Sequence, residues 1–122
     1  MIEWPPTHPS GCMQRIIAKD DSLGTIRNHA CEKISLDQTI SNYTSALAIM
    51  DFKYCPENFT NAFTTHRKAW EALIPVVKKY EHQRGEMHDL FKILEQSEDS
   101  SLFKQKLKLV WDTWTDVEKA TQ

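Results

Sequence analysis

Glycine, long apolar runs and an excess of charge of one sign are all lacking in this sequence. Three scattered glycines among 122 residues cannot build a loop that wraps a phosphate group, which excludes the common nucleotide-binding motifs. A membrane-spanning helix needs about 20 consecutive apolar residues, and the sequence has no such run. Fifteen basic and 17 acidic residues nearly balance. We therefore expect no integral membrane segment and no nucleic-acid partner.

Motifs for catalysis and for cofactors are missing too. No serine stands in a glycine-flanked strand–helix turn of the hydrolase type, and no cysteine has the context of a known cysteine protease. Helical bundles that hold metals typically carry Glu-x-x-His pairs, and none is present. The sequence therefore predicts no catalytic residue, no cofactor and no metal ligand set, and we expect a protein that is not an enzyme.

What the sequence does contain is a helical pattern from Ser35 onward, and Ser35-Leu36-Asp37-Gln38 predicts a capping box at the start of the first helix. Apolar residues recur at alternating spacings of three and four, which is typical of amphipathic helices. Short polar links separate the segments, so neighbouring helices should run antiparallel. We predict an all-α fold, a four-helix up-down bundle over residues 31–122, whose second helix is kinked at Pro75. The four apolar stripes are Leu36–Met50, Phe59–Tyr80, Met87–Leu94 and Phe103–Val117.

Residues 1–30 differ from the rest in their chain breakers. Trp4-Pro5-Pro6 and Pro9-Ser10-Gly11 disfavour helix at the start. Asp20-Asp21-Ser22 is typical of a turn, which leaves room only for a short helix over 12–19. The sequence predicts that residues 1–30 form an extended N-terminal arm that packs on the bundle domain of residues 31–122.

Three cysteines leave two interpretations open. Cys12, Cys31 and Cys55 do not have the spacing of a zinc site. They are either three reduced thiols, as is common in the cytoplasm, or one disulfide and one free thiol in an oxidising compartment. In the second case a Cys31–Cys55 bond would join the start of the first bundle helix to the start of the second.

His66 is the most informative polar residue, because it lies inside the apolar stripe of the second helix. A buried histidine usually has a hydrogen-bond partner and only a structural role. The functional alternative is a small-ligand- or metal-binding bundle that uses His66, with His88 or Cys55 contributing from neighbouring helices.

The corner from Arg84 to His88 holds further candidate residues. Gly85 should allow close packing there, and Arg84 should form an ion pair with a neighbouring helix. Glu86 and His88 are two positions apart and should point to different sides of a helix. A surface clamp between His82 and Glu86 is an alternative. Separately, Trp111 lies beside the last stripe and is a candidate anchor for a partner.

Residues 31–70 resemble small, helical, cysteine-containing periplasmic proteins that include bacterial lysozyme inhibitors. The resemblance rests on Cys31, on Tyr43 in a polar helix and on Arg67-Lys68-Ala69-Trp70, although this chain has no cysteine after Cys55. The chain is also similar to helical immunity proteins of secreted bacterial toxins. These resemblances imply a periplasmic or otherwise extracytoplasmic protein that binds or inhibits another protein; the alternative location is the cytoplasm.

Overall fold

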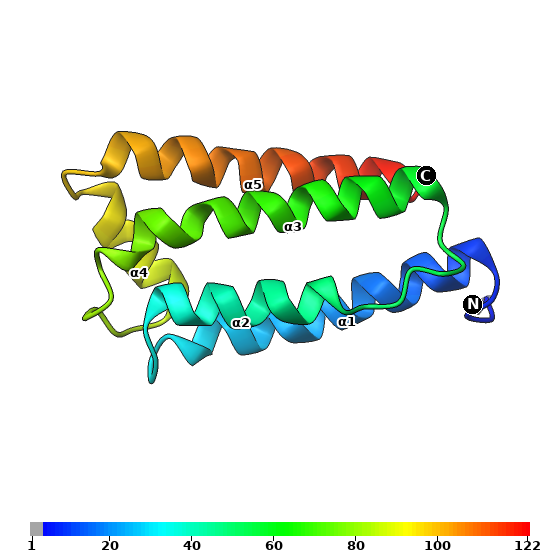
Figure 1. The fold of residues 1–122 in the computed structure, drawn as a ribbon, viewed down its shortest axis with the longest axis horizontal. Helices are drawn as coiled ribbons and strands as arrows, with labels where there is room; N and C mark the ends of the chain where they lie inside the picture. The colour runs from blue at the N-terminus through cyan, green and yellow to red at the C-terminus, as the bar shows by residue number, and fades with distance from the viewer. Residues whose placement is uncertain (1–3) are drawn as a thin grey trace.

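The computed structural model describes residues 4–122, and every regular element in that part of the chain is an α-helix. The predicted all-α class is confirmed. Residues 31–122 contain four helices, as expected, but a further helix precedes them, so the described residues have five. Figure 1 shows four long helices side by side along the long axis and one short helix at one end. In chain order the helices are α1 (Pro9–Ala30), α2 (Leu36–Ala48), α3 (Glu57–Lys78), α4 (Met87–Glu95) and α5 (Ser100–Ala120).

Helix α1 is the largest departure from the sequence prediction. The extended arm expected over residues 1–30 is wrong, because α1 takes up most of that segment; residues 1–3 of it lie outside the described residues. Pro9 is in the first turn, where a proline has no intrahelical hydrogen bond to lose. The side chain of His8 accepts a hydrogen bond from the backbone N–H of Ser10 at 3.0 Å and caps this end. Pro9, which was expected to prevent a helix, is instead the first residue of α1.

The polar residues of the predicted turn lie in the middle of α1. The hydroxyls of Ser22 and Thr25 donate to the backbone oxygens of Ala18 and Asp21, at 3.3 and 3.2 Å. These side chains bond within the helix, so they do not compete with its backbone hydrogen bonds. The helix therefore continues through a segment that favours a turn in isolation.

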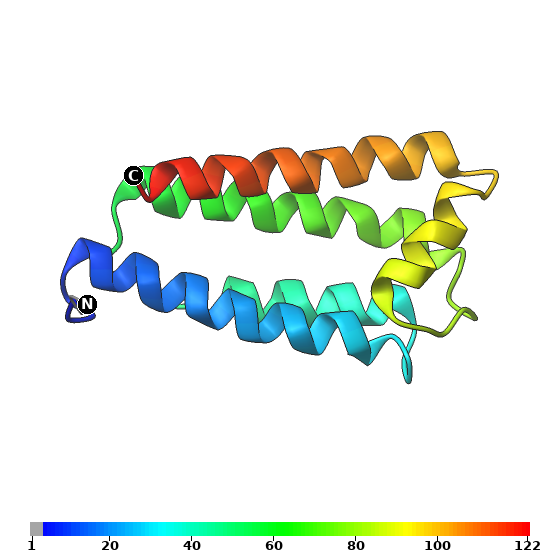
Figure 2. The ribbon, with the colours of Figure 1, turned by 180° about the vertical axis from the view of Figure 1, so that it is seen from behind.

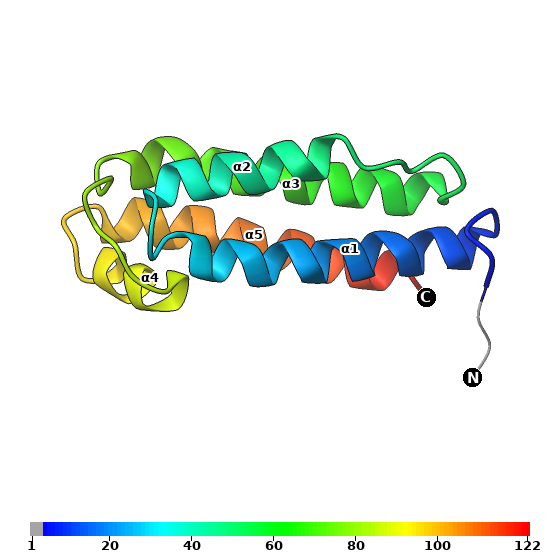
Figure 3. The same ribbon diagram turned by 90° about the horizontal axis from the view of Figure 1, so that it is seen from below.

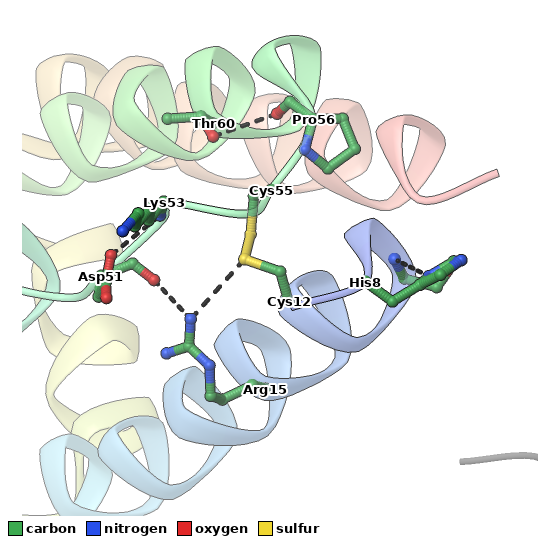
Figure 4. Close-up of a disulfide and its surroundings, with 9 residues drawn as sticks. His8, Cys12, Arg15, Asp51, Lys53, Cys55, Pro56 and Thr60 are labelled. Atoms are coloured by element: carbon green, nitrogen blue, oxygen red, sulfur yellow. Dashed lines mark hydrogen bonds between the residues drawn. A yellow bond between two sulfur atoms is a disulfide. The ribbon is translucent and has the colours of Figure 1, made fainter. Parts of the chain in front are cut away.

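A disulfide joins Cys12 near the start of α1 to Cys55 in the link before α3, and Figure 4 shows its surroundings. The predicted Cys31–Cys55 pair is wrong. Cys31 is a buried free thiol at the other end of α1, about 28 Å along the helix from Cys12 at 1.5 Å per residue. The side chain of Arg15 lies beside the bond and donates to the backbone oxygen of Asp51 at 2.6 Å.

The hydrophobic core lies between α3 and its two main neighbours, α2 and α5. Most side chains of the stripes predicted from the sequence are buried in this core. The outer faces are mostly polar, although Ile93, Leu102, Leu109 and Trp111 are exposed there. Within residues 4–122 no helix is both long and apolar enough to cross a membrane. The most completely buried large side chains include Phe59, Phe63, Phe103, Leu36, Ile40, Leu73 and Leu94.

Two local predictions about α2 and α3 can be compared with the structure. Ser35 caps α2, accepting a hydrogen bond from the backbone N–H of Gln38 at 3.3 Å. The reciprocal half of the capping box is absent, because the Gln38 side chain donates to Asn42 instead, at 2.7 Å. Pro75 lies inside α3, which continues to Lys78 as expected. The kink at Pro75 stays a prediction.

Candidate functional site

Helix α1 places two charged residues on the face that it turns toward the bundle. Asp20 and Arg27 are seven residues apart, or two helical turns, so they lie on one side of the helix. Ile16 is one turn before Asp20 on that side and is fully buried. The inner face of α1 is thus apolar at one end and charged in the middle, where folding alone would favour apolar side chains.

Asp20 is buried and hydrogen-bonded to α2. Only 9% of its surface is exposed, and one carboxylate oxygen accepts a hydrogen bond from the hydroxyl of Tyr43. Burial raises the pKa of Asp20, and the Tyr43 hydroxyl and the nearby Arg27 charge counteract part of that rise. Burial and the Asp20 charge also raise the pKa of Tyr43, so the hydroxyl is a donor throughout the physiological range.

Arg27 stacks on aromatic rings from two other helices. Its guanidinium carbon is 4.6 Å from the ring centre of Tyr43 and 4.4 Å from that of Trp70. Its Nε and one terminal nitrogen donate to the Asn28 side chain at 3.2 and 3.0 Å. No carboxylate of residues 4–122 is within 4 Å of it. The positive charge is therefore held by cation–π contacts and not by a direct ion pair.

His66 has both ring nitrogens engaged. Trp70 Nε1 is only a donor, so His66 Nε2 at 3.2 Å must be the unprotonated acceptor. His66 Nδ1–H then donates to the hydroxyl oxygen of Thr113 at 2.9 Å, and that hydroxyl donates to the backbone oxygen of Leu109 at 2.7 Å. Burial and the Arg27 charge lower the pKa of His66 to about 4. The network holds a neutral imidazole without a free nitrogen.

These buried groups border a groove between α1 and α5, which we call the α1–α5 seam. Figures 2 and 3 show that the two helices lie on the same side of the bundle. The seam contains a larger pocket of about 590 Å³ and a smaller one of about 160 Å³, and both are lined by Asp20 and Trp114. The remaining lining residues of the larger pocket are Trp4, Ser10, Met13, Gln14, Ile17, Ala18, Asp21 and Thr121. Those of the smaller pocket are Arg27, Tyr43, His66, Trp70, Val110 and Trp111.

The structure thus brings two of the sequence candidates to one site. His66 lies at the floor of the smaller pocket and Trp111 at its edge, where 51% of the indole residue is exposed. Asp20 and Arg27 were not expected as site residues. Their signal was the helical spacing with Ile16, which the breakers around Pro9 and the polar run after Asp20 obscured.

The Arg84–His88 corner lies elsewhere and is built differently from its prediction. Arg84 is exposed, and its guanidinium donates to backbone oxygens of Glu81 and Gln83 at 2.7 and 2.9 Å. The expected ion pair to another helix is wrong, because among residues 4–122 no carboxylate is near it. Glu86 is 2.7 Å from His88 Nδ1, although we expect them to diverge. Glu86 precedes α4 as its N-cap, where helical spacing does not apply.

The metal-binding alternative for His66 needs further ligand side chains close to it. The part of the chain from Trp4 to Gln122 has no group of three or more histidine, cysteine or acidic side chains placed to hold a metal ion. Cys55, one of the partners considered for His66, is in the disulfide. Comparisons with protein-family models, with curated proteins and with solved structures find no match. The site must therefore be interpreted from its own geometry.

Proposed function

We propose that this chain is a non-enzymatic, extracytoplasmic binding protein that holds a segment of another protein against the α1–α5 seam. The observation that supports it most is the pair of adjacent pockets that share Asp20 and Trp114 in their lining. Their α1 lining extends from Ser10 to Arg27, about 25 Å along the helix. This length suits an elongated occupant more than a compact small molecule.

The volume of the larger pocket limits which parts of a partner can enter the seam. A helix about 10 Å wide that covered the distance of about 17 Å from Ser10 to Asp21 along α1 would fill roughly 1,300 Å³, more than twice the 590 Å³ of the larger pocket. The partner backbone therefore stays outside, and its side chains enter. The exposed Trp111 at the rim offers an aromatic anchor of the kind that dominates binding energy in protein interfaces.

The chemistry of the seam supports binding over catalysis. His66 has no free nitrogen to act as a base. The free thiol of Cys31 is buried, and burial raises its pKa, which disfavours the nucleophilic thiolate. The Cys12–Cys55 disulfide supports the proposed extracytoplasmic location, since such bonds persist in oxidising compartments.

Site-specific photo-crosslinking in the native host tests the proposal. A photoreactive amino acid is placed at Gln14 or Ala18, which are exposed residues of the seam, and at Ser45, an exposed α2 residue outside both pockets, as a control. We expect one defined protein to be attached at the two seam positions and not at Ser45. Equal labelling at all three positions, or a product made of two copies of this chain, contradicts the proposal.

The purified partner then allows a direct measurement. Trp111→Ala should weaken its binding at least about tenfold, as expected for an aromatic anchor. Ile49→Ala is the matched control, because Ile49 is also an exposed apolar residue but belongs to the C-terminal end of α2. If both variants bind as well as the wild type, the partner does not use this rim.

A further inference from the structure

The larger pocket of the seam combines carboxylates with indole rings. Asp20 and Asp21 line its α1 side, Trp114 its α5 side and Trp4 its end. Among the described residues, no lysine or arginine lines this pocket. Negative charge beside aromatic faces is the combination that attracts a cation. The electrostatic character of the pocket therefore differs from the near-neutral balance of the whole chain.

Asp20 has an oxygen left over for a ligand. Its first oxygen accepts from Tyr43. The second makes no hydrogen bond to residues 4–122, and it is not among the buried polar atoms that lack a partner, so it is accessible from the pockets that Asp20 lines. A carboxylate that is nine-tenths buried, with only one oxygen hydrogen-bonded by the protein, is costly to keep charged. A cation that enters the pocket would satisfy it.

The nearest positive charge in the protein does not fill this role. Arg27 is held by the rings of Tyr43 and Trp70 and by Asn28, and it makes no direct ion pair with Asp20. It lines the smaller pocket and not the larger one. Among residues 4–122, therefore, no cationic side chain lines the larger pocket beside Asp20.

We propose that the larger pocket binds an arginine side chain of the partner, with its guanidinium against Trp114 and hydrogen-bonded to the carboxylates of Asp20 and Asp21. A guanidinium is planar, so it stacks on an indole and presents paired donors to carboxylates, which an ammonium group does not do. The proposal rests on the proposed function, because the arginine must come from a bound protein segment.

An NMR titration with a minimal probe tests the pocket without the partner. The probe is arginine blocked at both ends, as N-acetyl-arginine N-methylamide. Blocked citrulline has nearly the same shape without the charge, and blocked lysine has the charge without the plane. We expect saturable millimolar binding of the arginine probe that shifts the Trp114 indole N–H and the amide of Asp21. Citrulline should leave these signals unchanged, and lysine should bind more weakly. Equal shifts from arginine and citrulline, or no saturable shift, overturn the proposal.

Two charge-removing variants sharpen the test. Asp21→Asn should weaken the arginine probe at least about fivefold, and because Asp21 is exposed the protein should stay folded. Asp116→Asn removes the same charge from α5, two positions from Trp114 and so on another side of that helix; it should leave the affinity unchanged. If both variants weaken the probe equally, only general attraction to an acidic protein is at work, and the pocket is not specific.

The partner separates failure of this inference from failure of the proposed function. A crosslinked partner that binds Asp21→Asn and the wild type equally well shows that the seam is an interface but that arginine recognition is wrong. If the arginine probe binds specifically but no protein is crosslinked at the seam, the pocket recognises arginine and the proposed protein interface is wrong.

Discussion

The hydroxyl of Tyr43 on α2 donates a hydrogen bond to the carboxylate of Asp20 on α1, and both residues are more than nine-tenths buried. This bond joins α1, which was not predicted from the sequence, to α2, which was. It also fixes the carboxylate at the point where the two pockets of the α1–α5 seam meet. The geometry of the site therefore depends on one side-chain hydrogen bond between helices.

Removal of that donor should destabilise the protein. Tyr43→Phe keeps the ring under Arg27 but leaves the Asp20 oxygen buried without its partner. We expect a loss of about 1–3 kcal/mol in the free energy of unfolding, measured by urea titration. Tyr54→Phe is the control, because the Tyr54 side chain is exposed and donates no hydrogen bond within residues 4–122; it should change stability by less than about 0.5 kcal/mol. Equal effects of the two variants would show that the Tyr43–Asp20 bond contributes little.

The disulfide should be the largest single contribution to stability. Cys12 and Cys55 are 43 residues apart, and in the chain-entropy treatment a closed loop of that length stabilises the fold by about 4 kcal/mol. Cys12→Ser should therefore lower the midpoint of urea unfolding strongly. A reducing agent should lower the wild type to the same value and leave Cys12→Ser unchanged. A wild type that does not respond to reduction would mean that Cys12 and Cys55 are not bonded in solution.

Acid should destabilise the protein through His66. Its pKa is about 4 in the folded state and about 6.5 when unfolded, so between these values the unfolded chain binds more protons. The stabilisation from the neutral imidazole is complete above pH 6.5 and is lost as the pH falls toward 4, by about 3 kcal/mol in total. The raised pKa of Asp20 acts in the opposite direction. The difference between the wild type and His66→Gln isolates the histidine.

Urea titrations of both proteins across this pH range provide the measurement. The wild type should lose more stability than His66→Gln between pH 6.5 and 4. His82→Gln, at an exposed histidine, should follow the wild type. Parallel pH profiles for the wild type and His66→Gln would show that folding does not lower the pKa of His66, which contradicts a buried neutral imidazole in the Trp70–His66–Thr113 network.

The hydrophobic pattern decides which helices could be predicted from the sequence. The stripes of α2, α3, α4 and α5 could be found because apolar residues form most of their buried faces. Helix α1 could not, because Asp20 and Arg27 interrupt its apolar spacing and are accommodated by partners distant in sequence, Tyr43 and Trp70. A prediction that considers each segment by itself cannot take into account partners from other helices. A local mismatch of this kind is expected where a functional site competes with folding.

The disulfide and the protonation state of His66 both depend on residues that are distant in the sequence. The pairing of Cys55 depends on where α1 brings Cys12, so an error in the helix became an error in the bond. The buried position of His66 followed from its own stripe, and the structure confirms it at 3% exposure. Its neutral state depends on Trp70 and Thr113, and the second of these is 47 residues away in the sequence.

Asp20→Asn should separate stability from binding. The asparagine side-chain oxygen can still accept from Tyr43, and removal of the charge also removes the cost of burying it, although Arg27 then loses an opposite charge nearby. Because these effects oppose one another, we expect the free energy of unfolding to change by less than about 1 kcal/mol. The blocked arginine probe should nevertheless bind at least about fivefold more weakly, since the carboxylate at the floor of the pocket is gone. If Asp20→Asn unfolds the protein, the buried charge is needed for the fold; if it is stable and binds the probe normally, Asp20 is not part of the recognition site.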